Sequence, residues 1–282
     1  MSWWFAPAPD GRLRALRILI GGYAFVYLAV RLPEFFKVAH YDRGQFEPVG
    51  VTRILHAPLA PELVLVIGIA TCLLLGCLVA NVQYRITAPL AALGLLWTLT
   101  YRNSWGMVFH TENLLVLHVM VLAVAPPKGE AGWPIKLMAV LTTLTYLLAG
   151  IAKLRIGGAD WLDGELLRNQ IAVDNLRKAL LGDSTAPLAN LFLHHPNNLL
   201  VFSFLTLVIE VGAPLALVHR RIGYVWAVTA WAFHLGVVLL MNIWFPYPLL
   251  GFAFLPLLPA EKLIDLATTV VVMLRNLSSR RS

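Results

Sequence analysis

The chain has 282 residues, of which 59% are hydrophobic and only 13% are charged, with a mean hydropathy of +0.74. A soluble protein of this length could not bury that much apolar surface, so the composition excludes a soluble fold and predicts a polytopic membrane protein. The net charge of +7 therefore reflects membrane topology and contact with anionic lipid, and no nucleic-acid partner is expected.

The N-terminal segment predicts a first membrane helix that is retained. In "MSWWFAPAPDGRLRALRILIGGYAF" a basic cluster precedes the first long apolar run, and no small-residue cleavage site follows that run. A cleavable signal peptide would need such a site. We therefore expect an uncleaved helix that anchors the chain in the membrane.

The apolar runs along the chain predict an all-α bundle of about eight transmembrane spans, because about 20 apolar residues cross a bilayer. This bundle forms one domain over residues 10–277, and the sequence leaves no room for a soluble domain. The last span is interrupted by Pro246, Pro248 and Pro256, which predicts a broken or re-entrant helix. The expected spans are 15–32, 62–82, 86–101, 110–126, 134–154, 198–218, 222–241 and 243–258.

Lysine and arginine positions predict the orientation. With eight spans, twelve of the cationic residues lie on the side of the two termini and ten on the other side. Most of the ten sit in two long loops, which translocate with little regard to charge. The sequence thus predicts an integral protein of the inner or plasma membrane with both termini in the cytoplasm.

Two amphipathic segments are expected to lie along the membrane surface. The first is "DWLDGELLRNQIAVDNLRKALLGD" in the outer loop 155–197, where Asp160 and Asp163 can cap or precede a helix that begins near Gly164. The second is the short segment 262–277 near the C-terminus. Membrane lipids are therefore expected partners of the chain.

Ionisable side chains inside the apolar runs need an explanation, because a charge at the bilayer centre costs about 2.5–3.5 kcal/mol or more. His118 is mid-span, which favours an interhelical hydrogen bond. Glu210 in "LVIEVGAPL" must be protonated or paired with a lysine or arginine. His234 in "WAFHLGVV" is a neutral imidazole that can bind a ligand oxygen or a partner side chain.

The segment "FHTENLL" places three polar residues at the start of the fourth span. On a helix His110 and Asn113 share a face, whereas Glu112 points elsewhere. Glu112 is either structural, favoured by the helix dipole, or part of a site. Cys72 and Cys77 lie on different faces of one helix, so neither a disulfide nor a metal site is expected.

Lys153 in "LLAGIAKLRIGGADWLDG" allows two interpretations. Near a helix end, its long side chain can reach water at the interface and act only as an anchor. If Lys153 instead faces the bundle, desolvation favours the neutral amine, which can act as a base near neutral pH. The residues alone leave both interpretations open.

Several short motifs resemble one family. "GIAKL" followed by "DWLDGELL" is similar to the transmembrane region of vitamin K-dependent γ-glutamyl carboxylases and their bacterial relatives, the HTTM (horizontally transferred transmembrane) proteins. The resemblance continues in "LRALRILIGGYAFVYL", in "FHTENLL" and in "AWAFHLGVVLLMNIWFPYPLLGF", and it covers residues 10–258. The resemblance rests on the order and spacing of these short motifs.

The resemblance implies quinone chemistry in the lyase class. Lys153 would be the catalytic base that deprotonates reduced vitamin K or another quinol, and no metal would be needed. The matching histidines, His110 and His234, would lie in the same pocket, with Asn113 and Trp161 as further binding residues. Glu112, His118 and Glu210 would support them as intramembrane polar residues.

Two departures from the carboxylases leave alternatives open. We expect no lumenal soluble domain after the membrane region, and an alanine precedes Lys153 where the carboxylase pattern has a second lysine. The first hypothesis is an enzyme related to quinone-dependent carboxylases and epoxidases. The second is a non-enzymatic membrane module that assists the maturation or export of a secreted peptide or protein, and a transporter is a third.

Overall fold

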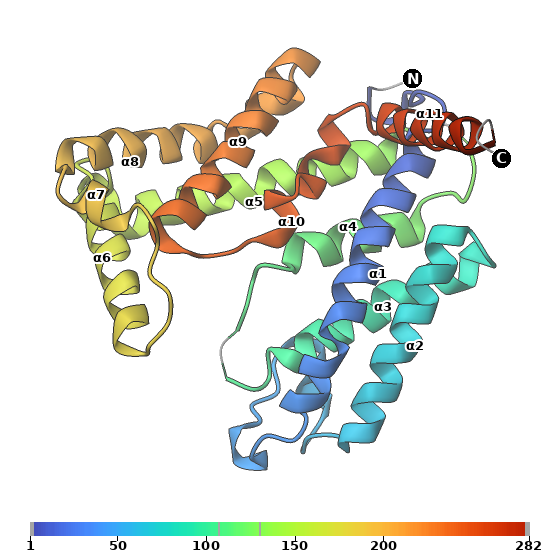
Figure 1. Cartoon of the computed structure of the whole chain (residues 1–282), viewed down its shortest axis with the longest axis horizontal. Helices are drawn as coiled ribbons and strands as arrows, with labels where there is room; N and C mark the ends of the chain where they lie inside the picture. Colours follow the sequence, from blue (N-terminus) through green and yellow to red (C-terminus); the bar gives the residue numbers. More distant parts are fainter. Residues whose placement is uncertain (1–2, 107, 130, 280–282) are drawn as a thin grey trace. The chain divides into compact units, whose positions relative to one another are not determined.

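The computed structural model describes residues 3–106, 108–129 and 131–279, and within these ranges the chain is helical and contains no strand (Figure 1). The all-α prediction is therefore confirmed for the described residues. The chain divides into two compact units, Met1–Met138 with Pro259–Ser282, and Ala139–Leu258. Helix α5 (Trp133–Gly157) begins in the first unit and continues in the second.

The first unit is built from helices of different length, of which α1 (Arg12–Val38) and α2 (Pro61–Ala80) are the longest apolar ones that lie wholly within it. Besides these and the start of α5, it contains α3 (Tyr84–Arg102), α4 (Asn113–Val124) and α11 (Ala260–Ser279). Helices α1 and α2, blue and cyan in Figure 1, run alongside each other and make the most extensive helix contact of the unit. Pro61 at the start of α2 and the left-handed Asn81 after its end mark its limits.

The interior of the first unit contains the interhelical hydrogen bond that the sequence predicted. His118 of α4 is fully buried, and its Nε2 lies 3.1 Å from the carbonyl oxygen of Met138 on α5. This contact satisfies a polar side chain within an apolar run, so the prediction for His118 is confirmed.

The second unit contains the remainder of α5 and a set of shorter helices. These are α6 (Glu165–Leu180), α7 (Ala189–Leu193), α8 (Pro196–Val211), α9 (Arg220–Met241) and α10 (Pro246–Leu249), with 3₁₀ turns at Gly158–Trp161, Ala213–Leu217 and Phe252–Leu257. The broken eighth segment is confirmed, because the prolines there leave only the short α10 and a 3₁₀ turn.

The amphipathic helix of the long loop begins where the sequence predicted. Gly164 adopts the left-handed conformation (φ 83°) before Glu165, the first residue of α6. The Asp163 carboxylate accepts a hydrogen bond from the Glu165 backbone N–H at 2.9 Å, which satisfies one of the donors that a helix start leaves open.

The predicted number of spans is not confirmed. Among the described residues, four helices are long and apolar enough to cross a membrane, and α4 and the Leu199–Val211 part of α8 are shorter apolar helices. These apolar helices are consistent with an integral membrane protein. The four long helices are Arg12–Val38, Pro61–Ala80, Trp133–Trp161 and Arg220–Met241.

The fourth apolar segment starts later than predicted, at Asn113 instead of residue 110. Asn103 explains the difference, because its side-chain amide donates to the Phe109 carbonyl at 2.9 Å and its oxygen accepts from the Phe109 N–H at 3.1 Å. These bonds hold Phe109 outside a helix. His110 therefore precedes α4, and it does not share a helix face with Asn113 as predicted.

Helix α11 covers the predicted surface segment 262–277 and packs against α1. Arg12 donates from Nε and Nη2 to the two carboxylate oxygens of Glu261, each at 2.7 Å. Hydrogen bonds from Arg12 hold the Glu261 pKa below its ordinary value. The pair joins the first turns of two helices that are far apart in the sequence.

The contribution of this pair to stability should depend on pH. Because the folded-state pKa of Glu261 is lowered, the stabilisation is present above the ordinary glutamate pKa and is lost as the pH falls through the folded value. We expect Glu261→Gln at pH 7 to raise amide exchange in α11 about fivefold. Hydrogen-exchange protection factors measure this effect, and equal protection in both proteins at pH 7 would contradict it.

Candidate functional site

A glycine on α5 allows α8 to approach closely at the level of Lys153. A Cβ atom on Gly150 would lie 2.9 Å from the Cβ of Glu210 and 3.1 Å from the Val211 backbone nitrogen. Gly150 is three residues before Lys153, so the two lie on the same side of α5. The missing side chain thus lets α8 place Glu210 against α5 within reach of the lysine.

Lys153 and Glu210 form an ion pair between α5 and α8. The Glu210 side chain is 3% exposed and the Lys153 side chain is 23% exposed. The Lys153 ammonium also lies 5.2 Å from the ring centroid of Trp161 and 5.7 Å from that of Phe233. Lys153 is therefore directed at a carboxylate and two aromatic rings. Glu210 has a cationic partner, which is one of the two states that the sequence left open.

His234 of α9 is buried beside the same part of α5. Its Nε2 is 2.7 Å from the Tyr146 hydroxyl, and either group can donate in this bond. The ring also packs against Phe233 and Phe245. His234 thus binds a partner side chain, which is one of the two roles that the sequence left open.

Tyr146 is a polar residue of this cluster that the sequence analysis did not single out. It precedes Lys153 by seven residues, or two helical turns, and Gly150 lies between them at the intervals expected for one helix face. That periodicity could have identified it. The face of α5 formed by Tyr146, Gly150 and Lys153 is referred to below as the polar face.

Three buried polar atoms near the polar face have no hydrogen-bond partner among the described residues. They are Oε2 of Glu210, Nδ1 of His234 and Nε1 of Trp161. Each of these residues is at least nine-tenths buried, with exposed fractions of 3%, 9% and 3%. Because buried polar groups are normally satisfied, these three atoms are the candidates in the second unit for contact with a ligand or an ordered water.

Trp161 is held in place by the segment that follows Lys153. The Ser203 hydroxyl on α8 donates to the Trp161 backbone carbonyl. At Gly164 a Cβ would lie 2.7 Å from the Leu200 nitrogen, so the glycine permits both the left-handed turn and close contact with α8. The motif "DWLDG" therefore attaches the start of α6 to α8.

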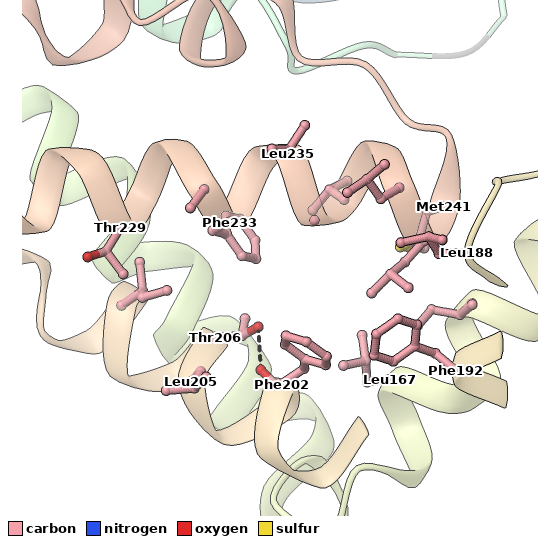
Figure 2. Close-up of a pocket in the computed structure, with 17 residues that line it drawn as sticks. Leu167, Leu188, Phe192, Phe202, Leu205, Thr206, Thr229, Phe233, Leu235 and Met241 are labelled. Carbon is pink, nitrogen blue, oxygen red and sulfur yellow. Dashed lines mark hydrogen bonds between the residues drawn. The ribbon is translucent and has the colours of Figure 1, made fainter. Parts of the chain in front are cut away.

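An apolar cavity of about 360 Å³ lies within the second unit, between α8 and α9 and next to α6 and α7 (Figure 2). Figure 2 shows Phe233 of α9 on one side and Phe202 and Thr206 of α8 on the other. None of the ionisable residues lines this cavity, but Phe233 both lines it and contacts the Lys153 ammonium. Phe233 thus connects the cavity with the polar cluster formed by Lys153, Glu210, Trp161 and His234.

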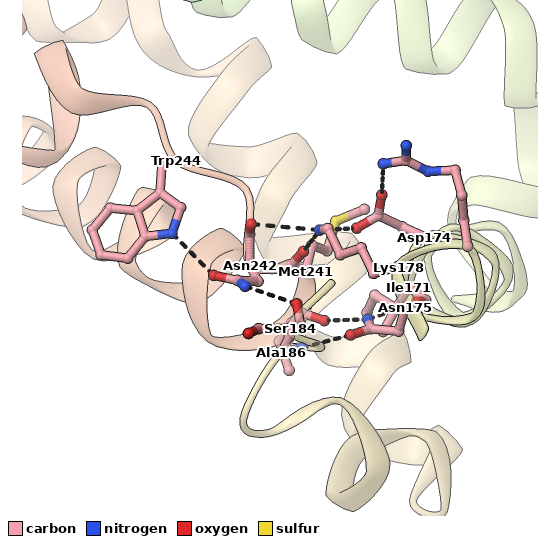
Figure 3. Close-up of polar contacts among 11 residues, drawn as sticks. Ile171, Asp174, Asn175, Lys178, Ser184, Ala186, Met241, Asn242 and Trp244 are labelled. Atoms are coloured by element: carbon pink, nitrogen blue, oxygen red, sulfur yellow. Dashed lines mark hydrogen bonds and ion pairs between the residues drawn. The ribbon is translucent and has the colours of Figure 1, made fainter. Parts of the chain in front are cut away.

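Polar contacts attach α6 to the end of α9 beside this cavity (Figure 3). The Asn175 amide donates to the Leu240 carbonyl at 3.0 Å, and Lys178 donates to the Met241 carbonyl. Asp174 binds the same lysine at 2.5 Å. These donors satisfy carbonyl groups that the last turn of α9 would otherwise leave without partners. The side chains of α6 therefore cap the C-terminal end of α9, next to the part of the cavity that α6 lines.

In the first unit, Glu112 belongs to a buried polar cluster of its own. Its carboxylate accepts hydrogen bonds from the Tyr27 hydroxyl and from Arg102, the latter at 3.1 Å. Arg102 also lies 3.4 Å from Glu34. The carboxylate is therefore paired with a cation, which fits the structural interpretation of Glu112.

Asn113 and Glu112 line a separate cavity of about 250 Å³ in the first unit, and both His110 and Asn113 are exposed. The structure thus places His234, Trp161 and Glu210 with Lys153 in the second unit, and His110, Asn113, Glu112 and His118 in the first. That His110 and Lys153 share a pocket stays a prediction.

No protein-family model, curated protein or solved structure was found to match the chain. Within the described residues, His, Cys, Asp and Glu form no group of three or more that could hold a metal ion.

Removing one member of the Lys153–Glu210 pair should destabilise the protein. Lys153→Met leaves a buried carboxylate without its cation, and we expect a loss of about 2–4 kcal/mol in the free energy of unfolding. The double variant Lys153→Met/Glu210→Leu should recover most of that loss, because neither charge remains. Denaturant titration in a fixed detergent measures both, and additive losses would contradict the pairing.

A methyl group at Gly150 should separate α5 from α8. We expect Gly150→Ala to lower the free energy of unfolding by about 1–3 kcal/mol, because the Cβ overlaps the Glu210 side chain and the Val211 backbone. Gly22→Ala on α1 is the matched control, since a Cβ there meets nothing within 4 Å. Equal stabilities of the two variants would show that α8 does not approach α5 at Gly150.

Proposed function

We propose that the chain is an integral membrane protein that binds an apolar hydroxylated molecule of the quinol class in the second unit. In this proposal the chain crosses the membrane about eight times, with both termini in the cytoplasm. The observation that carries the proposal is the set of unpartnered buried polar atoms on Glu210, His234 and Trp161 around one lysine. An oxygen-bearing ligand can satisfy these atoms.

The residues of the second unit fit a quinol in two respects. The cavity beside Phe233 has almost only apolar lining, and its volume of about 360 Å³ suits a ring or part of an isoprenoid chain. The polar cluster behind Phe233 offers an acceptor at Glu210 Oε2 and a donor at Trp161 Nε1. A hydroxylated ring needs both kinds of group, and a reduced quinone supplies electrons when bound.

The Lys153–Glu210 pair would act as the proton acceptor. In the resting protein the two groups form an ion pair. When the ligand is bound, transfer of one proton from the ammonium to the carboxylate would yield a neutral amine and a neutral acid, and a dry site lowers the cost of this transfer. The amine can then take the phenolic proton, and the ammonium that forms stays beside the phenolate. Lys153 is therefore the proposed catalytic base, and His234, held by Tyr146, would orient the oxygen.

Together with the motifs quoted above, this arrangement supports a relationship to the HTTM proteins and to the membrane region of the vitamin K-dependent carboxylases. Carboxylation of a peptide glutamate is a narrower proposal that would also need a substrate protein to reach the site. The second candidate function is a non-enzymatic module for a secreted peptide. The exposed amphipathic helix α6 favours it, because α6 presents Val173, Leu176 and Leu180 outward.

Lys153→Arg tests the proposal without breaking the ion pair. Arginine keeps the charge and can bind Glu210, but it cannot act as a base because it stays protonated. The protein is reconstituted in liposomes with reduced vitamin K, and oxygen uptake and quinol consumption are followed. We expect Lys153→Arg to reduce the rate at least about 100-fold, as expected for loss of a general base.

Lys37→Arg is the matched control, because Lys37 is exposed and lies in the first unit. It should retain the parent rate. A parent rate no higher than that of empty liposomes, or an unchanged rate in Lys153→Arg, would contradict the enzyme proposal and favour the peptide module.

A further inference from the structure

A second cavity, in the first unit, has a different chemistry from the apolar cavity. It measures about 640 Å³ and is formed by the start of α1, the end of α2 and the connection from α4 to α5. Three cations and a single carboxylate line it, together with apolar side chains. The lining includes Arg14, Arg17, Lys128, Asp10, Leu13 and Ile18.

Arg17 is the buried member of this group, with 7% of its surface exposed. Its Nη1 donates to Asn81 Oδ1 at 3.0 Å and to the Pro127 carbonyl at 2.9 Å. Its Nε is buried and has no hydrogen-bond partner among the described residues. The two groups that bind Arg17, an amide oxygen and a backbone carbonyl, are thus neutral. They fix the guanidinium at the cavity wall and leave its positive charge without a counter-charge.

Arg14 and Lys128 are exposed at the same cavity. Among the residues that the structure describes, neither of them forms an ion pair, and Arg17 forms none either. Such a concentration of uncompensated cations raises the local concentration of anions. Asp10 at the rim offsets only part of this charge.

The start of α1 adds donors to the same cavity. Gly11 precedes the helix in the left-handed conformation and provides no side-chain cap for the first turn. The N–H groups of that turn carry a partial positive charge and favour an anion. The first of these N–H groups, that of Arg12, donates to the Pro9 carbonyl at 3.2 Å. The next two belong to Leu13 and Arg14, and both residues line the cavity.

We propose that this cavity binds the phosphate group of an anionic ligand. Arg17 and the first turn of α1 form the inner part of the site, and Arg14 and Lys128 form its mouth. The apolar lining by Leu13, Ile18 and Val79 suits a lipid phosphate, whose glycerol and acyl groups continue into an apolar region. A free phosphate would use only the cations. This site is independent of Lys153 and of the proposed quinol chemistry.

The two exposed cations allow a test that does not disturb the buried Arg17. The full-length chain in a neutral detergent is titrated with phosphatidylglycerol, with phosphatidylcholine and with inorganic phosphate, and the midpoint of thermal unfolding is followed. We expect phosphatidylglycerol to raise the midpoint and phosphatidylcholine to leave it unchanged. Arg14→Gln and Lys128→Gln should each weaken phosphatidylglycerol binding about fivefold, and the double variant should weaken it about 25-fold.

Arg85→Gln is the matched control, because Arg85 is also an exposed cation of the first unit but does not line the cavity. It should bind phosphatidylglycerol as the parent does. A rise with inorganic phosphate that the double variant abolishes would identify a free phosphate as the ligand. The proposal is overturned if neither anion raises the midpoint, or if Arg85→Gln loses as much binding as the double variant.

Discussion

The structure of the second unit depends on the ion pair that neutralises the buried carboxylate of Glu210. Glu210 lies in an apolar helix with 3% of its side chain exposed, and a charge in that position is unfavourable unless a cation meets it. Lys153 meets it from α5, and the Gly150 next to it on that face allows the approach. The spacing of α5 and α8, and hence the position of Trp161, follows from this pairing.

The same pairing explains why polar groups gather at one level of the unit. Tyr146, two turns before Lys153, binds His234 of α9, so the polar face of α5 contacts both neighbouring helices. The pair and this hydrogen bond use one atom each of Glu210 and His234, and the other atoms stay without partners among the described residues. A site whose anchoring bonds are satisfied and whose other buried atoms are not is suited to holding a polar group of a ligand.

The need for polar partners inside the apolar helices could be predicted from the sequence. The free-energy cost of an isolated charge or polar group in an apolar run depends on that residue and its neighbours in the chain. That cost predicted that Glu210 is either protonated or paired with a cation, and that His118 forms an interhelical hydrogen bond. A cationic partner for Glu210 and the hydrogen bond of His118 are both present. The identity of the cation could not be predicted, since Lys153 lies 57 residues away in the chain. Hydropathy likewise predicted where apolar helices lie, but the number of spans remains unconfirmed.

Other features depended on contacts that no sequence pattern reports. The late start of α4 results from Asn103 binding the backbone of Phe109, and the basic cavity of the first unit results from three segments meeting at Arg17. The helical spacing from Lys153 could have identified Tyr146 as a residue of the same face. Tyr146 was not singled out because its side chain is uncharged at neutral pH, and only residues that can carry a charge near that pH needed an explanation within an apolar run. The positions of charged residues and of helix-breaking prolines could thus be predicted from the sequence. The hydrogen bonds of neutral side chains that fix the backbone could not.

The ion pair between α5 and α8 implies that Glu210 is an ionised carboxylate held by Lys153. Infrared difference spectroscopy of the reconstituted parent against Glu210→Gln measures this directly. We expect the difference spectrum to contain the paired stretching bands of a carboxylate. We also expect Glu210 to become a protonated acid when Lys153 is replaced by methionine. A protonated-acid band for Glu210 in the parent, unchanged by that replacement, would contradict it.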